Sequence, residues 1–210
     1  MTAAGRALVA GVVWLLPPAA RAQGGGGQPD SVIYVLTAES RFEVKTGKAG
    51  LLGFAGHTHV VRARGVQGRV VYYPNAPESS RVAIVVPADS LEVLTPSDTA
   101  EIAKVTQAMR TDVLHVDQYP AINFVSTAVT RTAEGFQLQG RLTLVGQSRD
   151  VMVDIPVDIG RDTLRARGGF SVKQTDFGIK PYRGGPAGTV RVADRVTFSF
   201  EAIGVRMPEP

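Results

Sequence analysis

Hydrophobic and polar residues alternate most strictly between residues 136 and 159. Two sets of alternating positions are almost entirely apolar: Phe136, Leu138, Gly140, Leu142 and Leu144, then, after a break at residues 146–148, Val151, Val153, Ile155, Val157 and Ile159. Because successive side chains of a strand point to opposite faces, this period predicts strands with one buried and one solvated face. Two such strands joined by a tight turn form an antiparallel hairpin.

The same β-rich pattern recurs along most of the chain. Further strands are expected at residues 32–36, 41–46, 51–56, 57–63, 68–73, 82–86, 121–130, 163–173 and 190–203. The apolar faces of so many strands must be covered by a second sheet or by closure of the same sheet. The pattern therefore predicts an all-β antiparallel barrel. Pro156 cannot donate to a strand ladder, so we expect a bulge or a sheet edge there.

The period changes once, near residue 95. Residues 95–98 (TPSD) supply a helix cap, a proline for the first turn and an early acidic residue. Ile102, Val105 and Met109 then recur at helical spacing. One short amphipathic helix ending near Arg110 is predicted, flanking or plugging one end of the sheet.

The N-terminus has the features of a secretory signal peptide. Arg6 precedes an apolar run over residues 7–20, and residues 20–22 (ARA) place small side chains where a signal peptidase cleaves. The alternative is a membrane anchor, but the apolar run is too short to span a bilayer comfortably. We expect cleavage near Ala22 and a periplasmic or secreted protein.

After removal of residues 1–22, the chain divides into a Gly-rich leader (23–30), one domain (31–205) and a short tail (206–210). Its net charge falls from +4 to +2, and no Lys/Arg run is interleaved with aromatics, so a nucleic-acid partner is not expected. The chain has no cysteine, which excludes a disulfide framework and a lipoprotein anchor. The domain is long enough to bury a real core.

Little in the sequence favours catalysis. Residues 146–150 (GQSRD) lack the final glycine of a nucleophile elbow and fall in a predicted hairpin. The acidic residues are scattered, with no pair that the sequence places at the spacing of glycosidases. The sequence therefore provides no candidate catalytic residues.

His57 and His59 are the most suggestive polar pair. On a strand they share a face with Val61 and Ala63, which indicates an inward position. Two imidazoles at this spacing could bind a metal ion, but a zinc site needs three or four ligands, and nothing places His115 nearby. A metal-binding or metal-dependent protein is therefore one hypothesis. The alternatives are a polar lining at a cavity mouth or a proton-sensitive ligand contact.

Four segments together resemble a known family: residues 119–126 (YPAINFVS), 140–146 (GRLTLVG), 176–179 (DFGI) and 192–196 (VADRV). In this order and spacing they are similar to the YceI family of exported, lipocalin-like, isoprenoid-binding proteins. The resemblance extends from about Asp30 to Ile203. It departs at residues 48–59 (KAGLLGFAGHTH), where the glycines and the histidine pair resemble a variant branch.

The resemblance implies an extended eight-stranded lipocalin-like barrel that holds a polyisoprenoid or an isoprenoid quinone in an internal tunnel. It also implies a cofactor-free protein without enzymatic activity. Residues 48–59 would line the cavity and so bear on the identity of the ligand.

Candidate tunnel-lining residues follow from the alternation: Phe42, Val44, Phe54, His57, His59, Val61, Ile84, Phe124, Leu142, Leu144, Phe170 and Phe198. His57 and His59 would meet a polar head group if the tunnel opens at their end. Small barrels can also be packed solid, so a structural or stress-response module with a filled core is a third hypothesis. The expected partner is an apolar small molecule, without a stable membrane span, and a homodimer is left open.

Overall fold

The computed structural model describes residues 31–48, 58–94, 99–184 and 190–208. Its strands are β1 (Val32–Leu36), β2 (Arg41–Lys48), β3 (Val60–Ala63), β4 (Gln67–Tyr72), β5 (Arg81–Pro87), β6 (Leu91–Val93), β7 (Ala121–Thr132), β8 (Gly135–Leu144), β9 (Gln147–Ile155), β10 (Val157–Ile159), β11 (Thr163–Lys173), β12 (Arg183–Gly184) and β13 (Val190–Arg206). The helical segments are η2 (Pro77–Ser79), η3 (Ala88–Ser90), α1 (Thr99–Ala108), η4 (Met109–Val113) and η5 (Gln174–Phe177). The predicted all-β antiparallel fold with one short mid-chain helix is confirmed.

Several predictions concern residues outside these described ranges. They are the signal peptide and leader at residues 1–30, the strand at residues 51–56 with Phe54, the residue His57, and the helix cap at residues 95–98.

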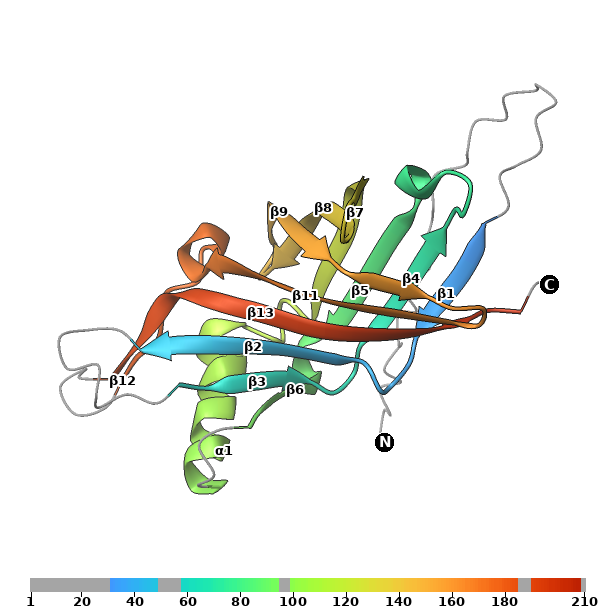
Figure 1. Cartoon of the computed structure of the whole chain (residues 1–210). Coiled ribbons are helices and arrows are strands. Elements are labelled where there is room, and N and C mark those ends of the chain that lie inside the picture. The colour runs from blue at the N-terminus through green and yellow to red at the C-terminus, as the bar shows by residue number, and fades with distance from the viewer. Residues whose placement is uncertain (1–30, 49–57, 95–98, 185–189, 209–210) are drawn as a thin grey trace, which may run out of the picture.

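The strands form one antiparallel sheet whose main path runs β6-β3-β2-β13-β1-β4-β5-β7-β8-β9, with β10, β11 and β12 joined to its side. The sheet bends into two layers (Figure 1). β2, β3, β6 and β13 lie across the front, and β4, β5, β7 and β8 rise behind them at an angle. The inner faces of the two layers therefore face each other.

Strand β13 connects the layers. One of its edges pairs with β2 and, further along, with β1, whereas the other edge pairs with β11. The chain turns between β1 and β2 at residues 37–40, where the backbone N–H of Ile203 donates to Ser40 Oγ at 3.0 Å. The Ser40 hydroxyl thus gives a backbone N–H of β13 a hydrogen-bond partner at the point where the strand's neighbour changes from β2 to β1.

The β8–β9 hairpin has the predicted alternation. Leu138, Leu142 and Leu144 are buried, whereas Gln139 and Arg141 between them are exposed. The turn consists of two residues, Val145 and Gly146, both with positive φ (46° and 70°). Positive φ at both central positions gives the turn a twist that matches the flanking strands.

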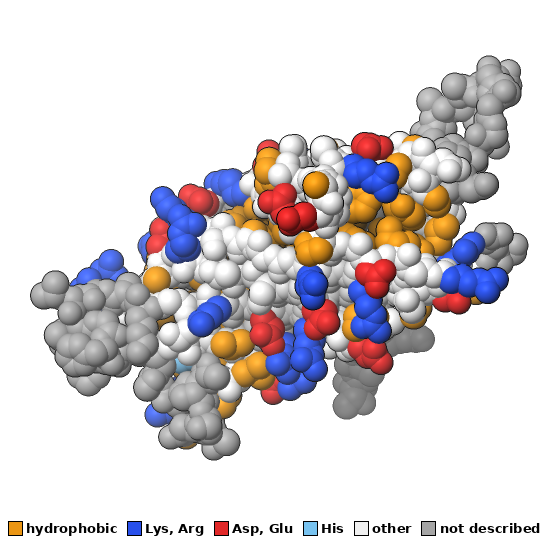
Figure 2. Space-filling view, in the orientation of Figure 1, with side chains coloured by type: hydrophobic (Ala, Val, Ile, Leu, Met, Phe, Trp, Pro, Cys, Tyr) orange, Lys and Arg blue, Asp and Glu red, His pale blue; other side chains and the backbone are white. Residues whose placement is uncertain are grey.

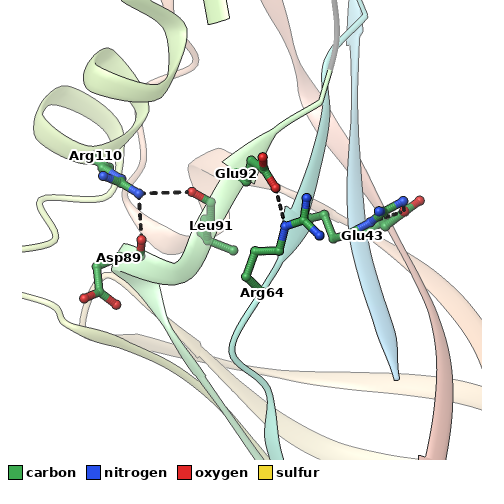
Figure 3. Close-up of polar contacts among 7 residues, drawn as sticks. Glu43, Arg64, Asp89, Leu91, Glu92 and Arg110 are labelled. Carbon is green, nitrogen blue, oxygen red and sulfur yellow. Dashed lines mark hydrogen bonds and ion pairs between the residues drawn. The ribbon is translucent and has the colours of Figure 1, made fainter. Parts of the chain in front are cut away.

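Helix α1 packs against β3 and β6. Ile102, Val105 and Met109 contact the buried cluster that includes Val61 and Val93, as the helical spacing predicts. Arg110, in the following η4, donates to the carbonyl oxygens of Asp89 (2.7 Å) and Leu91 (3.4 Å), which ties the helix end to η3 and β6 (Figure 3). Within the described ranges, no helix has the length and hydropathy required to cross a membrane.

The sheet does not close by a continuous ladder. β9 pairs with β8, and the strand is interrupted at Pro156. β10 then pairs with β11, at Val157–Ala166, Asp158–Arg165 and Ile159–Leu164. No ladder pair joins β9 itself to β11 in the part of the chain that the structure describes. Pro156, which has no N–H to donate, marks the point where the chain changes its pairing partner from β8 to β11. β9 is therefore an edge strand at one end of the main path.

Candidate functional site

An apolar cavity lies between the inner faces of the two layers. The space open to the centre of a water molecule measures about 180 Å³. This space is well above the ~10–15 Å³ needed to admit a single water, so the inner faces do not pack solidly against each other. Its apolar lining includes Leu36, Phe42, Val44, Val61, Val70, Ile84, Ile122, Phe124, Phe136, Leu138, Leu142, Val153, Ile155, Val157, Leu164, Ala166, Phe170, Phe198, Phe200 and Ala202.

Aromatic pairs across neighbouring strands form part of the wall. Phe42 of β2 stacks on Phe200 of β13, with ring centroids 5.7 Å apart. Phe170 of β11 stacks on Phe198 of β13 at 4.9 Å, with the rings within 3° of parallel. Stacked aromatic pairs on neighbouring strands stabilise a sheet, and these rings also supply apolar surface to the cavity.

Phe124 of β7 completes the opposite wall, and Gly140 of β8 makes room for it. A Cβ at Gly140 would lie 2.3 Å from the Phe124 ring, so the ring occupies the place of a side chain at this position. Any larger residue at position 140 would displace the Phe124 ring toward the cavity, which lies on the inward side of the ring.

The ion pairs of β2, β3 and β6 lie on the outer face, whereas Glu43 and Arg69 are the charged residues among the described ones that border the cavity. Glu43 borders the cavity because of its position on β2. Its side chain forms an ion pair with Arg62 of β3, with 2.6 Å between Glu43 Oε1 and Arg62 Nη2. Arg64 and Glu92 form a further ion pair on the same outer face (Figure 3). The hydrogen bond from Arg64 lowers the pKa of the Glu92 carboxyl. These pairs join β2, β3 and β6, and most of the described residues that border the cavity are apolar.

Hydrophobic side chains also reach the surface at one end of the cavity. Figure 2 shows them over β4 and β1, beside the turn from β10 to β11. Tyr72 of β4 lines the cavity here and packs in the same cluster as Tyr34 of β1, which is 2% exposed. Burial raises the pKa of the Tyr34 phenol, and nearby Arg206 opposes this effect. We call this end, where hydrophobic side chains of the cavity region reach the surface, the mouth.

The opposite end is filled. Leu144, Val172 and Val196 form a buried cluster with Phe177 of η5 and Ile179, and we call this group the packed end. Phe177 is only 1% exposed. Leu142 belongs both to this cluster and to the cavity wall, so it marks the boundary between the two.

The predicted lining residues fall into three groups. Phe42, Val44, Val61, Ile84, Phe124, Leu142, Phe170 and Phe198 border the cavity. Leu144 lies in the packed end, and His59 is not among the bordering residues. Phe54 and His57 lie outside the described residues. That any of these side chains contacts a ligand stays a prediction.

His59 lies just before β3 rather than in a strand. Its backbone N–H donates to Thr46 Oγ1 at 3.1 Å, and its carbonyl accepts from the Thr46 N–H at 2.9 Å. His115 is exposed, at the positive-φ residue that follows η4. Among the described residues, no three His, Cys, Asp or Glu side chains gather as a metal site. The metal hypothesis stays untested, because His57 is outside these residues.

Several cavity residues were not among the predicted set although the same signal was present. Phe136 and Leu138 share the face of Leu142, and Phe200 shares the face of Phe198. Tyr72 had no such signal, because an aromatic residue in a strand is compatible with either face. Applying the alternation to every inward position would have found the first three.

The model of the YceI-like domain matches residues 35–203. No curated protein matches the chain.

Three solved structures illustrate the likeness. BcnA of Burkholderia cenocepacia is 20% identical with a TM-score of 0.61, and the match covers 79% of this chain and 96% of that chain. A polyisoprenoid-binding domain from Saccharophagus degradans, implicated in plant cell wall breakdown, is 10% identical with a TM-score of 0.57, covering 83% and 98%. The YceI protein of Campylobacter jejuni is 14% identical with a TM-score of 0.53, covering 71% and 85%.

At these identities the structural likeness establishes the fold, a lipocalin-like antiparallel barrel. The family match covers most of the sequence, including the four motif segments. The chain belongs to the YceI-like domain family.

Proposed function

We propose that this protein is an exported carrier or sequestering protein that holds a long apolar amphiphile, of polyisoprenoid or isoprenoid-quinone type, in its internal cavity. The observation that carries the proposal is an inward face of apolar side chains that do not fill the space between them. A polyisoprenoid-binding domain among the similar structures agrees with this ligand class.

The energetics favour an apolar occupant. Removing apolar surface from water contributes ~25 cal/mol per Å², so each 100 Å² of ligand buried contributes about 2.5 kcal/mol. Water gains little in such a cavity, because it finds few hydrogen-bond partners on a wall of Phe, Leu, Ile and Val side chains. Binding therefore needs no catalytic or ionic group in the interior.

We propose no enzymatic activity for this site. The described residues that border the cavity include the hydroxyls of Ser80 and Ser199 but no histidine that could act as their base. Ser80 Oγ instead accepts a hydrogen bond from the backbone N–H of Tyr73 at 3.2 Å.

Export is the other part of the proposal. It is supported by the sequence of residues 1–22, where Arg6, an apolar run and the ARA segment follow one another. A periplasmic or secreted protein would meet lipids that leave or cross the membrane.

Native mass spectrometry of the protein, purified from its own host without chelator, tests both parts. We expect a polypeptide that begins at Gln23 and carries a lipid-sized adduct that organic solvent removes. Fragmentation of the adduct would identify the ligand. A bare polypeptide would favour a filled structural module, and a metal-sized adduct would favour the histidine pair. Either result would contradict the carrier proposal.

A pair of tryptophan variants tests the cavity directly. Phe124→Trp adds bulk on the inward face, whereas Val125→Trp adds it one residue along, where Val125 is 51% exposed. Displacing about two methylene groups of a ligand, at ~0.8 kcal/mol each, corresponds to roughly tenfold in affinity. Titration with dansyl-labelled farnesol should show this loss for Phe124→Trp only, in variants whose folding is checked by circular dichroism. Equal affinities would place the ligand elsewhere.

A further inference from the structure

Along one line of the wall, two described strands that lie next to each other are not joined by ladder pairs. β9 pairs with β8 along its whole length, and β11 pairs with β13 from Thr163 to Lys173. The edges of β9 and β11 that face each other carry no ladder pair in the described residues. We call this line the seam.

The seam begins at a defined point. β10 and β11 are paired up to Val157–Ala166, and the Arg167 N–H still donates to the carbonyl of Pro156, at 3.4 Å. At the next residue, Gly168, a Cβ would lie 3.1 Å from Ile155 Cγ2 and 3.2 Å from the carbonyl oxygen of Asp154. The two backbones are therefore still close at Gly168, and beyond it β9 and β11 continue side by side without pairing.

Beyond Gly168 a groove separates the two strands on the outside. The groove has a volume of about 330 Å³ and is lined by Arg149, Asp150, Val151 and Met152 from β9, by Phe170, Ser171 and Val172 from β11, and by Asp176 and Phe177 from η5. The charged residues lie along its rim together with the apolar ones. Continuing the β10–β11 register places Met152 opposite Ser171. Met152 is 54% exposed, so an apolar side chain stands at the rim.

Phe170 separates this groove from the interior. It borders both the groove and the cavity, whereas its stacking partner Phe198 borders only the cavity. Phe170 is the one described residue that borders both spaces.

We infer that the seam between β9 and β11 is a lateral entrance through which the apolar ligand reaches the cavity, with Phe170 as its gate. This inference rests on the proposed function. Separating any ladder-paired neighbours in the wall would break backbone hydrogen bonds, whereas opening the seam breaks only side-chain contacts. A long branched chain could enter here sideways, instead of threading lengthwise through the mouth.

Cross-linking tests the entrance, because the natural chain has no cysteine. A Met152→Cys/Ser171→Cys protein joined by a short bis-maleimide has its seam tied shut. The matched control, Ser171→Cys/Thr197→Cys, places the same linker across the paired edge of β11, where the two natural hydroxyls are 3.0 Å apart. Uptake of dansyl-farnesol is followed by stopped-flow fluorescence before and after linking.

We expect linking across the seam to slow uptake by about tenfold or more, an added barrier of ~1.4 kcal/mol or more, and the control linker to leave the rate unchanged. An unchanged rate across the seam would overturn the inference and leave the mouth as the route. If the unlinked protein does not bind dansyl-farnesol at all, the proposed function fails instead, so the two failures are distinguishable.

A second pair of variants tests the gate without cross-linking. Phe170→Ala and Phe198→Ala each remove one ring of the same stacked pair, so each variant takes one aromatic side chain from the cavity wall. Only Phe170→Ala also opens the wall into the groove, so both its uptake and release rates should exceed those of Phe198→Ala. Equal rates in the two variants would overturn the gating role of Phe170.

Discussion

Strand β8 passes through two regions that share one sequence pattern and differ in packing. Leu144 lies in the packed end, among Val172, Phe177 and Ile179. Leu138, on the same face of the same strand, borders the cavity. The two side chains are almost equally buried, at 5% and 7% exposure. Burial of a residue therefore does not reveal whether the space before it is filled.

The difference comes from what reaches each region. At the packed end, η5 places Phe177 into the space between the layers, and Ile179 follows it. At the cavity, the bordering residues lie in strands apart from Ser80, and they include the stacked pairs Phe42–Phe200 and Phe170–Phe198. A non-strand segment fills one end, and the other end keeps its space for a ligand.

Truncation of the two leucines of β8 should give the largest difference in stability between the packed end and the cavity. Leu144→Ala leaves a new void among fixed neighbours, and we expect it to lower the free energy of unfolding by about 2–5 kcal/mol. Leu138→Ala removes contacts only on the side away from the cavity, so its cost should lie below that of Leu144→Ala. Urea denaturation of both variants measures the difference. Equal losses would mean that the cavity is filled or collapsed in solution.

Enlarging a side chain should again cost more stability at the packed end than at the cavity. Ala166→Phe extends into the cavity, so we expect little loss of stability and roughly tenfold weaker binding of dansyl-farnesol, from about two displaced methylene groups. Val172→Phe overfills the packed end and should cost about 1–3 kcal/mol. Thermal melts and ligand titrations of both variants make the comparison. A destabilised Ala166→Phe protein with normal affinity would contradict the assignment of the two regions.

The sequence predicted the strands well because their inward faces alternate over long stretches, as in residues 136–159. It also predicted the helix face, since Ile102, Val105 and Met109 pack as their spacing requires. The short β6 was missed, because three residues give too little alternation to recognise.

The packed end could not be predicted, because it depends on η5, a segment without period. Leu144 was expected to line the tunnel for this reason: its position in the pattern equals that of Leu142. Whether a barrel interior is open depends on contacts between residues that are far apart in the chain, such as Leu144 and Phe177. Alternation assigns a face and gives no information about these contacts.

The smallest predicted effect concerns how η5 is held at the packed end. Asp194 of β13 accepts from the backbone N–H of Thr175 at 2.9 Å and from its hydroxyl at 2.8 Å. The backbone N–H is the main cause that lowers the pKa of the Asp194 carboxyl below its usual range. The carboxylate therefore anchors the segment that carries Phe177.

Because the folded-state pKa is lower than the unfolded one, this stabilisation is present above about pH 4 and is lost as the pH falls through the lower folded value. Asp194→Asn should reduce stability at neutral pH by about 1 kcal/mol or less, since the group is largely solvated, and should flatten the acid limb of the stability curve. Thr175→Val keeps the backbone donor and should lose less. The affinity for dansyl-farnesol should change in neither variant, because Asp194 is not among the described residues that border the cavity. Denaturant titrations between pH 3 and pH 7 test this, and parallel curves for wild type and Asp194→Asn would mean that the carboxylate does not hold η5.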